Sequence, residues 1–224
     1  MRSIWRTLDR STIRSIALIS LSVGIVGVSY GVTATAAGFP LWQILALAIL
    51  VLGSSSEFLF VGIAAASGNL LAAVVAGLLV NLRNFVYGVS AGEFLRPGWR
   101  KFFGAHLVND ESVAVAKSQI GLRRKRAAFW LCGLGILLCW PLGALLGASL
   151  GQIVQRPESL GLDAVFPAVL LALVLPAMRE RRTILAAAAG AALSLAATPF
   201  LPAGLAPLLA LSALLLVLPR RSIA

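Results

Sequence analysis

Three short clusters of polar and charged residues lie inside or against long apolar stretches in the first half of this sequence. They are Gly53-Ser54-Ser55-Ser56-Glu57, Asn81-Leu82-Arg83-Asn84 and Asn109-Asp110-Glu111. An ion or a hydrogen-bonding group in hydrocarbon is costly unless it is paired or lines a water-filled cavity. The clusters therefore predict a polar path through a membrane protein.

In the first cluster, three serines after a glycine can unwind a helix or hydrogen-bond back onto it. An unwound segment at mid-membrane exposes backbone N–H groups and a positive helix end, which suit a carboxylate. Glu57 follows at once and is a candidate proton-binding group. The alternative is a helix that packs through its serines, with Glu57 neutralised by Arg83 or capping a helix.

In the second cluster, helical spacing puts Asn81, Asn84 and Gly88 on one face and Arg83 with Tyr87 on another. An arginine at mid-span needs a counter-ion, and the nearby acidic residues can supply one. Arg83 is then either a ligand for a substrate carboxylate or half of a buried ion pair that fixes helix register. The sequence leaves both open.

In the third cluster, His106 stands one helical turn before Asp110. The two side chains could form a pH-sensitive pair. The alternative, which we favour for His106, is a helix cap at the membrane interface with the ring facing headgroups. Asp110 and Glu111 are candidates for ion coupling because an apolar segment follows them.

Composition indicates an all-α, polytopic membrane protein. Hydrophobic residues make up 59% of the 224 residues and charged residues 12%, about half the charge density of a soluble domain. The net charge of +11 is gathered in short runs between apolar stretches, as in membrane-flanking loops. The expected partner is therefore the lipid bilayer, and a nucleic-acid partner is not expected.

About eight membrane segments are expected. They cover approximately 15–37, 41–66, 70–95, 102–119, 127–151, 163–178, 183–198 and 203–218. The second is expected to break near 53–56, and the first is too long for a signal peptide. We expect one domain, 1–224, with a polar-site half at 15–119 and supporting spans at 120–218.

Lysine and arginine set the orientation. Most of them stand in four groups, at the N-terminus, at 123–126, at 179–182 and at 220–221. If all four groups are cytoplasmic, both termini are inside. The middle stays open: either 41–66 and 102–119 both cross, giving eight crossings, or both are re-entrant, giving six.

Glycines at a spacing of four form a ridge of small residues in the segment 127–151: Gly143, Gly147 and Gly151. Such ridges let helices approach closely. The partner is either another helix of this chain, which we favour, or a second protein.

Taken in order, the three clusters resemble the AzlC-type branched-chain amino acid permeases of bacteria, the large subunits of exporters. The first resembles a small-residue run that ends in Gln-Phe in that family. The second, with Tyr87-Gly88, resembles an Asn-x-Arg-His stretch, and Leu107-Val108-Asn109-Asp110-Glu111 resembles a Leu-x-x-Asp-Glu stretch. This chain departs twice, with Glu57 for the usual glutamine and Asn84 for the usual histidine.

The resemblance implies export of valine, leucine, isoleucine or similar amino acids across the bacterial inner membrane, with a small AzlD-type membrane subunit as partner. Since the chain has no Walker A sequence, transport is expected to be driven by an ion gradient. No enzymatic activity, cofactor or metal is expected.

The residues expected to contact substrate are Ser54, Ser55, Ser56, Glu57, Asn81, Arg83, Asn84 and Asp110, and those expected to couple an ion are Glu57, Asp110 and Glu111. Phe58 and Phe60 are expected to receive a branched side chain. One alternative is an intramembrane hydrolase in which a serine of 54–56, His106 and Asp110 form a triad. Another is an accessory subunit that only scaffolds a membrane complex.

Overall fold

The computed structural model describes residues 7–67, 69–95, 98–153, 171, 175, 178–201, 209–210 and 212–213. Within these residues every regular element is a helix, which confirms the predicted all-α class. Three helices are long and apolar enough to cross a membrane: α1 (Arg10–Ala36), α4 (Leu70–Ala91) and α7 (Leu122–Ile153). The chain is therefore a membrane protein.

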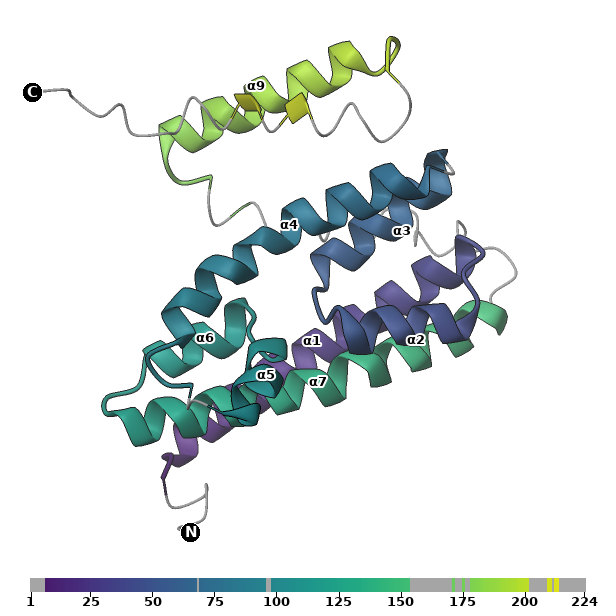
Figure 1. The fold of residues 1–224 in the computed structure, drawn as a ribbon. Coiled ribbons are helices and arrows are strands. Elements are labelled where there is room, and N and C mark those ends of the chain that lie inside the picture. The colour runs from purple at the N-terminus through teal and green to yellow at the C-terminus, as the bar shows by residue number, and fades with distance from the viewer. Residues whose placement is uncertain are drawn as a thin grey trace, which may run out of the picture.

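Two helical hairpins lie between these long helices (Figure 1). The first hairpin consists of α2 (Leu41–Leu50), residues 51–54 and α3 (Ser55–Ser67). It follows the end of α1, reaches the middle of the bundle and turns back. The second hairpin consists of α5 (Trp99–His106), residues 107–109 and α6 (Asp110–Lys117). It does the same from the opposite end, so the two hairpin tips meet.

The hairpins bear on the two arrangements of the middle region that the sequence left open. The break expected in 41–66 is present, but it covers residues 51–54, and Ser55 and Ser56 already belong to α3. The segment 102–119 is likewise interrupted, at residues 107–109. In Figure 1 both segments fold back near the middle of the bundle, as the re-entrant arrangement expects.

Only one of the three expected C-terminal spans can be compared. The span expected at 183–198 corresponds to α9 (Arg181–Ala197). Most of the spans expected at 163–178 and 203–218 lies outside the described residues.

Helices α1 and α7 run parallel and touch backbone to backbone. A Cβ added to Gly143 would lie 2.1 Å from the carbonyl oxygen of Gly24, and one added to Gly147 would lie 2.0 Å from that of Val28. In return, a Cβ on Gly31 would lie 2.1 Å from the carbonyl oxygen of Ala144. The glycine ridge thus packs inside this chain, as favoured from the sequence, and it needs glycine on both helices.

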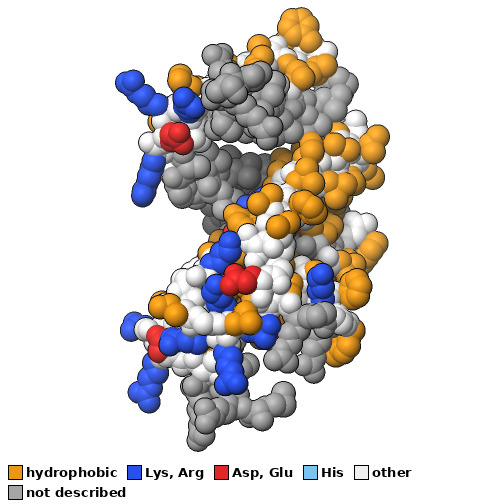
Figure 2. Space-filling view, turned by 60° about the vertical axis from the view of Figure 1, so that its left-hand side comes forward, with side chains coloured by type: hydrophobic (Ala, Val, Ile, Leu, Met, Phe, Trp, Pro, Cys, Tyr) orange, Lys and Arg blue, Asp and Glu red, His pale blue; other side chains and the backbone are white. Residues whose placement is uncertain are grey.

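One group of basic residues gathers at an end of the bundle, in the lower part of Figure 2, and a second group lies at the upper left of that view. Asp9, which caps α1, pairs with Arg124. Hydrogen bonds from the side chains of Ser11 and Thr12 lower the pKa of Asp9 to about 2, so it stays charged at physiological pH. Lys125 reaches Glu93 at 2.6 Å, which brings the C-terminal end of α4 to the same place.

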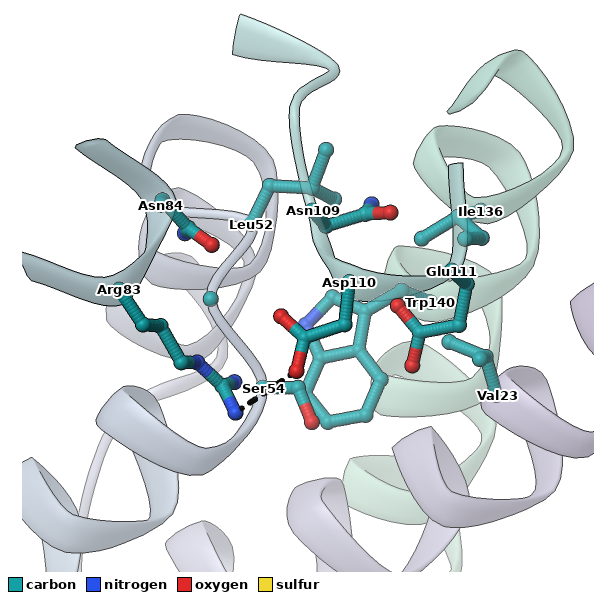
Figure 3. Close-up of a pocket in the computed structure, with 11 residues that line it drawn as sticks. Val23, Leu52, Ser54, Arg83, Asn84, Asn109, Asp110, Glu111, Ile136 and Trp140 are labelled. Carbon is teal, nitrogen blue, oxygen red and sulfur yellow. Dashed lines mark ion pairs between the residues drawn. The ribbon is translucent and has the colours of Figure 1, made fainter. Parts of the chain in front are cut away.

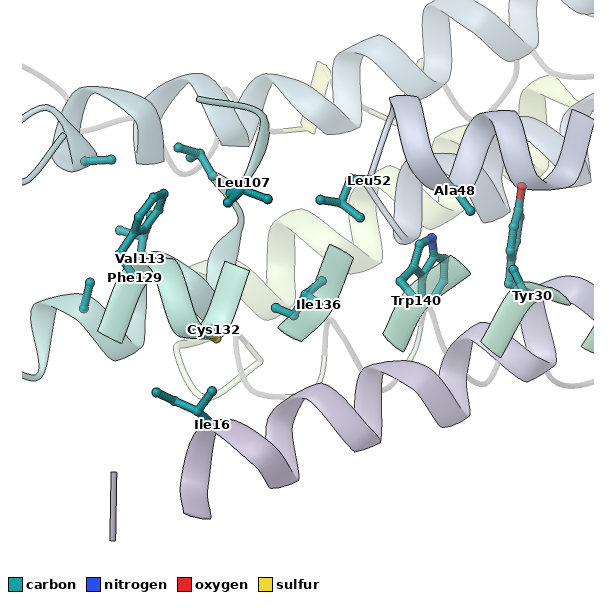
Figure 4. Packing of buried hydrophobic residues seen from close by; sticks show 14 of the residues in the cluster. Ile16, Tyr30, Ala48, Leu52, Leu107, Val113, Phe129, Cys132, Ile136 and Trp140 are labelled. Atoms are coloured by element: carbon teal, nitrogen blue, oxygen red, sulfur yellow. The ribbon is translucent and has the colours of Figure 1, made fainter. Parts of the chain in front are cut away.

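A buried apolar core lines α7 along its length (Figure 4). Ile16 of α1 packs on one side, while Leu107 and Leu52, from the two hairpin tips, approach from the other side toward Ile136. The core therefore fixes both tips against the same helix.

Replacing Gly31 by alanine should destabilise the protein, because the new methyl group meets backbone atoms that cannot rotate away. Overpacking of this kind costs about 1–3 kcal/mol. Gly88→Ala is the matched control, since a Cβ there meets nothing within 4 Å, and better helix propensity should raise stability by up to about 1 kcal/mol. The measurement is the melting temperature in detergent micelles, and equal melting temperatures for both variants would contradict the close α1–α7 contact.

Candidate functional site

The two hairpin tips contact each other midway along the bundle. A ring nitrogen of His106, the last residue of α5, lies 2.8 Å from the carbonyl oxygen of Ile49 near the end of α2. The tips bring residues 51–54 and 107–111 together beside α4 and α7. The first and third polar clusters of the sequence therefore form one region.

The tip of the first hairpin has an unusual backbone. Leu52 and Ser54 have φ angles of 49° and 48°, a left-handed conformation that costs a non-glycine residue roughly 1–2 kcal/mol. The side chain of Glu57 stabilises it, because Oε1 accepts hydrogen bonds from the backbone N–H groups of Gly53 (2.8 Å) and Ser54 (3.1 Å). The break and the glutamate thus depend on each other.

Glu57 is nearly inaccessible, with 1% of its surface exposed. Its third donor is the indole N–H of Trp140 on α7, at 3.2 Å from Oε1 and 3.1 Å from Oε2. Within the described residues Glu57 has no ion pair. The expected alternative in which Arg83 neutralises Glu57 is therefore wrong, whereas the alternative in which Glu57 caps a helix is what the hydrogen bonds show.

Arg83 joins the two hairpins from the middle of α4. One guanidinium nitrogen donates to the hydroxyl of Ser55 at 2.7 Å, and the other lies 3.0 Å from a carboxylate oxygen of Asp110. The counter-ion required by a mid-span arginine is thus Asp110. Beside this pair, Asn84 donates to the side chain of Asn81 at 3.1 Å.

The tip of the second hairpin is held by a capping box. The side chain of Asn109 accepts from the backbone N–H of Ser112 at 2.8 Å, and the Ser112 hydroxyl accepts from the N–H of Asn109 at 3.2 Å. These bonds start α6 at Asp110 and place Asp110 and Glu111 in its first turn, where a helix favours negative charge.

A cavity lies where the tips meet α1, α4 and α7 (Figure 3). Its volume is about 40 Å³, enough for a few water molecules. Its walls are formed by Val23, Leu52, Gly53, Ser54, Arg83, Asn84, Asn109, Asp110, Glu111, Ile136 and Trp140. One side is thus polar, and the other, from α1, α7 and Leu52, is mostly apolar.

Some of the residues expected to contact substrate or couple an ion line this cavity, and others lie outside it. Those that line it are Ser54, Arg83, Asn84, Asp110 and Glu111. Ser55 does not, but it holds Arg83. Ser56 and Asn81 sit against Gly53, where an added Cβ would lie 2.3 and 2.8 Å from their side-chain oxygens. Glu57 lies behind the wall, bonded to three of its residues.

Two expected contacts are not formed around this cavity. Phe58 and Phe60 do not line it: Phe58 is fully buried against Tyr30 and Trp140, and Phe60 meets Phe39 edge to face.

His106 does not pair with Asp110, because its ring nitrogen contacts the carbonyl oxygen of Ile49. Since Asp110 is paired with Arg83, a Ser–His–Asp triad is not formed.

Sequence reasoning missed Trp140 and the apolar wall, and it named Asn109 in the third cluster without expecting it to contact substrate. Trp140 lies within a uniformly apolar segment, where a tryptophan looks like any other core residue. Only Pro141, directly after it, sets that position apart. Asn109 carries the N-cap signature, an asparagine before a helical run, which is the signal that indicates its position at a helix start.

Four buried polar atoms of cavity-lining residues lack a hydrogen-bond partner. Two are donors, Nε of Arg83 and Nδ2 of Asn109, and two are acceptors, Oδ1 of Asn84 and Oδ1 of Asp110. An unsatisfied buried polar group costs about 1–3 kcal/mol, so four around one cavity indicate a place where water or a ligand completes the bonding.

The comparisons with known proteins identify a family. The family model described as AzlC protein matches residues 18–154, which include α1, α4, α7 and both hairpins. The chain belongs to the AzlC family, and its function is related to membrane transport. Neither a curated protein nor a solved structure matches the chain.

Glu57→Gln should keep the fold, because Oε1 alone receives the two backbone N–H bonds and one from Trp140. Loss of the Trp140 bond to the second oxygen should cost about 1 kcal/mol. Glu57→Ala should cost about 3 kcal/mol or more, because it leaves these buried donors without an acceptor. Melting temperatures in detergent should fall in the order wild type, glutamine, alanine; a glutamine variant as unstable as the alanine variant would contradict this account.

Proposed function

We propose that this protein is a secondary transporter that exports branched-chain or similar small amino acids across the bacterial inner membrane. Membership of the AzlC family supports a transport role. The observation that carries the proposal is the mixture of unsatisfied donors and acceptors around one cavity. An α-amino acid is a zwitterion, whose carboxylate needs donors and whose ammonium group needs acceptors.

The charged and amide groups on the polar side of the cavity divide into hydrogen-bond donors and hydrogen-bond acceptors. Arg83 and the amide N–H of Asn109 are the donors for a carboxylate, while Asp110, Glu111 and the amide oxygen of Asn84 are the acceptors for an ammonium group. Arg83 and Asp110 contact each other at 3.0 Å. We expect the zwitterion to insert between them, replacing one ion pair by two.

The apolar side favours an aliphatic side chain. Val23, Leu52 and Ile136 contribute branched aliphatic groups, and Trp140 contributes an aromatic face. Apolar contact of this kind gains free energy in proportion to the area removed from water. These residues take the role that the sequence had suggested for Phe58 and Phe60.

The remaining features of the proposal follow from charge and from the family. We propose that the end of the bundle with the ion pairs Asp9–Arg124 and Lys125–Glu93 faces the cytoplasm, because basic residues favour that side. We propose that both termini lie on the same side. The protein acts without a cofactor and not as an enzyme. An AzlD-type small subunit is the proposed partner, and an ion gradient, with protons as the first candidate, drives export.

Proteoliposomes containing the full chain, with and without a candidate small partner, should release labelled valine, leucine and isoleucine. An imposed pH gradient should change the rate. Arg83→Gln and Asp110→Asn should each reduce efflux about tenfold or more, because a lost hydrogen bond to a charged group is worth about 1.5–3 kcal/mol.

Glu93→Gln is the control, because it removes an ion pair at the cytoplasmic end and leaves the cavity untouched. Its efflux should equal that of the wild type. Full activity in the Arg83 and Asp110 variants would rule out the cavity as the substrate site, and efflux of none of the three amino acids under any condition would overturn the proposed substrate class.

A further inference from the structure

Trp140 is the only residue of the described structure that both lines the cavity and donates a side-chain hydrogen bond to Glu57. Its ring forms part of the apolar wall, and its N–H points to a carboxylate that the cavity itself does not reach (Figure 3 shows the ring in the wall). A change in the charge of Glu57 therefore reaches the cavity through this indole.

The two carboxylate oxygens of Glu57 are not equivalent. Oε1 accepts three hydrogen bonds, from Gly53, Ser54 and Trp140, whereas Oε2 accepts one, from Trp140. A proton that binds Glu57 therefore goes to Oε2, the oxygen with the freer lone pairs. The backbone of the tip stays bonded to Oε1, and the bond that changes is the one to the indole.

We propose that Trp140 is a positioning residue that links proton binding at Glu57 to the shape of the substrate cavity. With Glu57 ionised, both oxygens hold the indole in the cavity wall. With a proton on Oε2, that oxygen and the indole N–H are two donors facing each other, so the indole keeps only its hydrogen bond to Oε1 and is held less firmly. This inference rests on the proposed transport function and adds a regulation to it. Binding of a proton at Glu57 weakens binding of the amino acid in the cavity, and the reverse also holds. Exchange of a proton for an amino acid across the membrane requires such coupling.

Other titratable groups near this region must be separated from Glu57. Tyr30 of α1 stacks on Trp140 with ring centroids 5.3 Å apart. Arg83 of α4 and Asp110 of α6 are paired with each other. Glu111, also on α6, lines the cavity without an ion pair in the described structure, so its protonation must be distinguished from that of Glu57.

The first experiment measures binding of labelled leucine to the purified full chain over a range of pH. In the wild type, affinity should fall about tenfold as pH is lowered, a usual size for coupling between two sites. Trp140→Phe keeps an aromatic wall but removes the N–H, and Glu57→Gln fixes an N–H₂ group at the position of Oε2. Both should bind weakly at every pH, and the double variant should be no weaker than either single one.

Two controls define the specificity of this effect. Trp130→Phe alters a tryptophan that stacks on Phe103 outside the cavity, and it should keep the wild-type pH profile. Glu111→Gln should change the overall affinity but keep a pH-dependent step. A wild-type pH profile in Trp140→Phe would overturn the inference.

A second readout needs no substrate and so separates this inference from the proposed function. Tryptophan emission of the wild type should change with pH as the indole loses its hydrogen bond to Oε2, and Trp130→Phe should show the same change. Trp140→Phe and Glu57→Gln should not. If the emission change is present but no amino acid binds, the substrate proposal fails and the Glu57–Trp140 link stands; if the change persists in Trp140→Phe, the link fails.

Discussion

The carboxylate of Glu57 is the interaction on which the centre of this molecule depends. It gives acceptors to two backbone N–H groups at a tip where Leu52 and Ser54 adopt left-handed conformations, and it ties that tip to α7 through Trp140. Non-helical backbone at membrane depth is tolerated only where protein or water satisfies its polar groups. Glu57 meets this requirement for the first hairpin.

Once the first tip is fixed, the rest of the site follows from contacts made to it. Ser55, the first residue of α3, accepts from Arg83, and Arg83 in turn pairs with Asp110 on the second hairpin. At the second tip, Asn109 and Ser112 satisfy backbone N–H groups through a capping box, as Glu57 does at the first tip. The hydrogen bonds of Glu57 and the capping box of Asn109 and Ser112 therefore hold the two hairpin tips on either side of one cavity.

Much of the fold could be predicted because its signals are local. Long apolar stretches gave the membrane helices, and Gly143 and Gly147 correctly predicted a close helix contact within the chain. The direction of the two interrupted segments was left open, since hydropathy is the same for a helix that crosses and a hairpin that returns. The contacts of Arg83 with residues of both hairpins, which lie far from it in the sequence, could not be predicted from hydropathy either.

The candidate site was predictable in its charged residues and not in its walls. Arg83 and Asp110 stood out because charge is rare in lipid. Ser56 and Asn81 were chosen by the same rule, yet they pack against Gly53 beside the cavity. The apolar wall of Val23, Leu52 and Ile136 gave no signal, because its residues resemble every other core position until the fold brings them together.

The contact between α1 and α7 has a mechanical consequence. Where main chain touches main chain, as at Gly31 with Ala144 and at Gly147 with Val28, no side chain can change rotamer to let the helices slide. These two helices form a rigid frame. In the transport cycle that we propose, the motion that exposes the cavity first to one side of the membrane and then to the other is expected in α4 and the hairpin tips, which Arg83 joins through a hydrogen bond to Ser55 and an ion pair with Asp110.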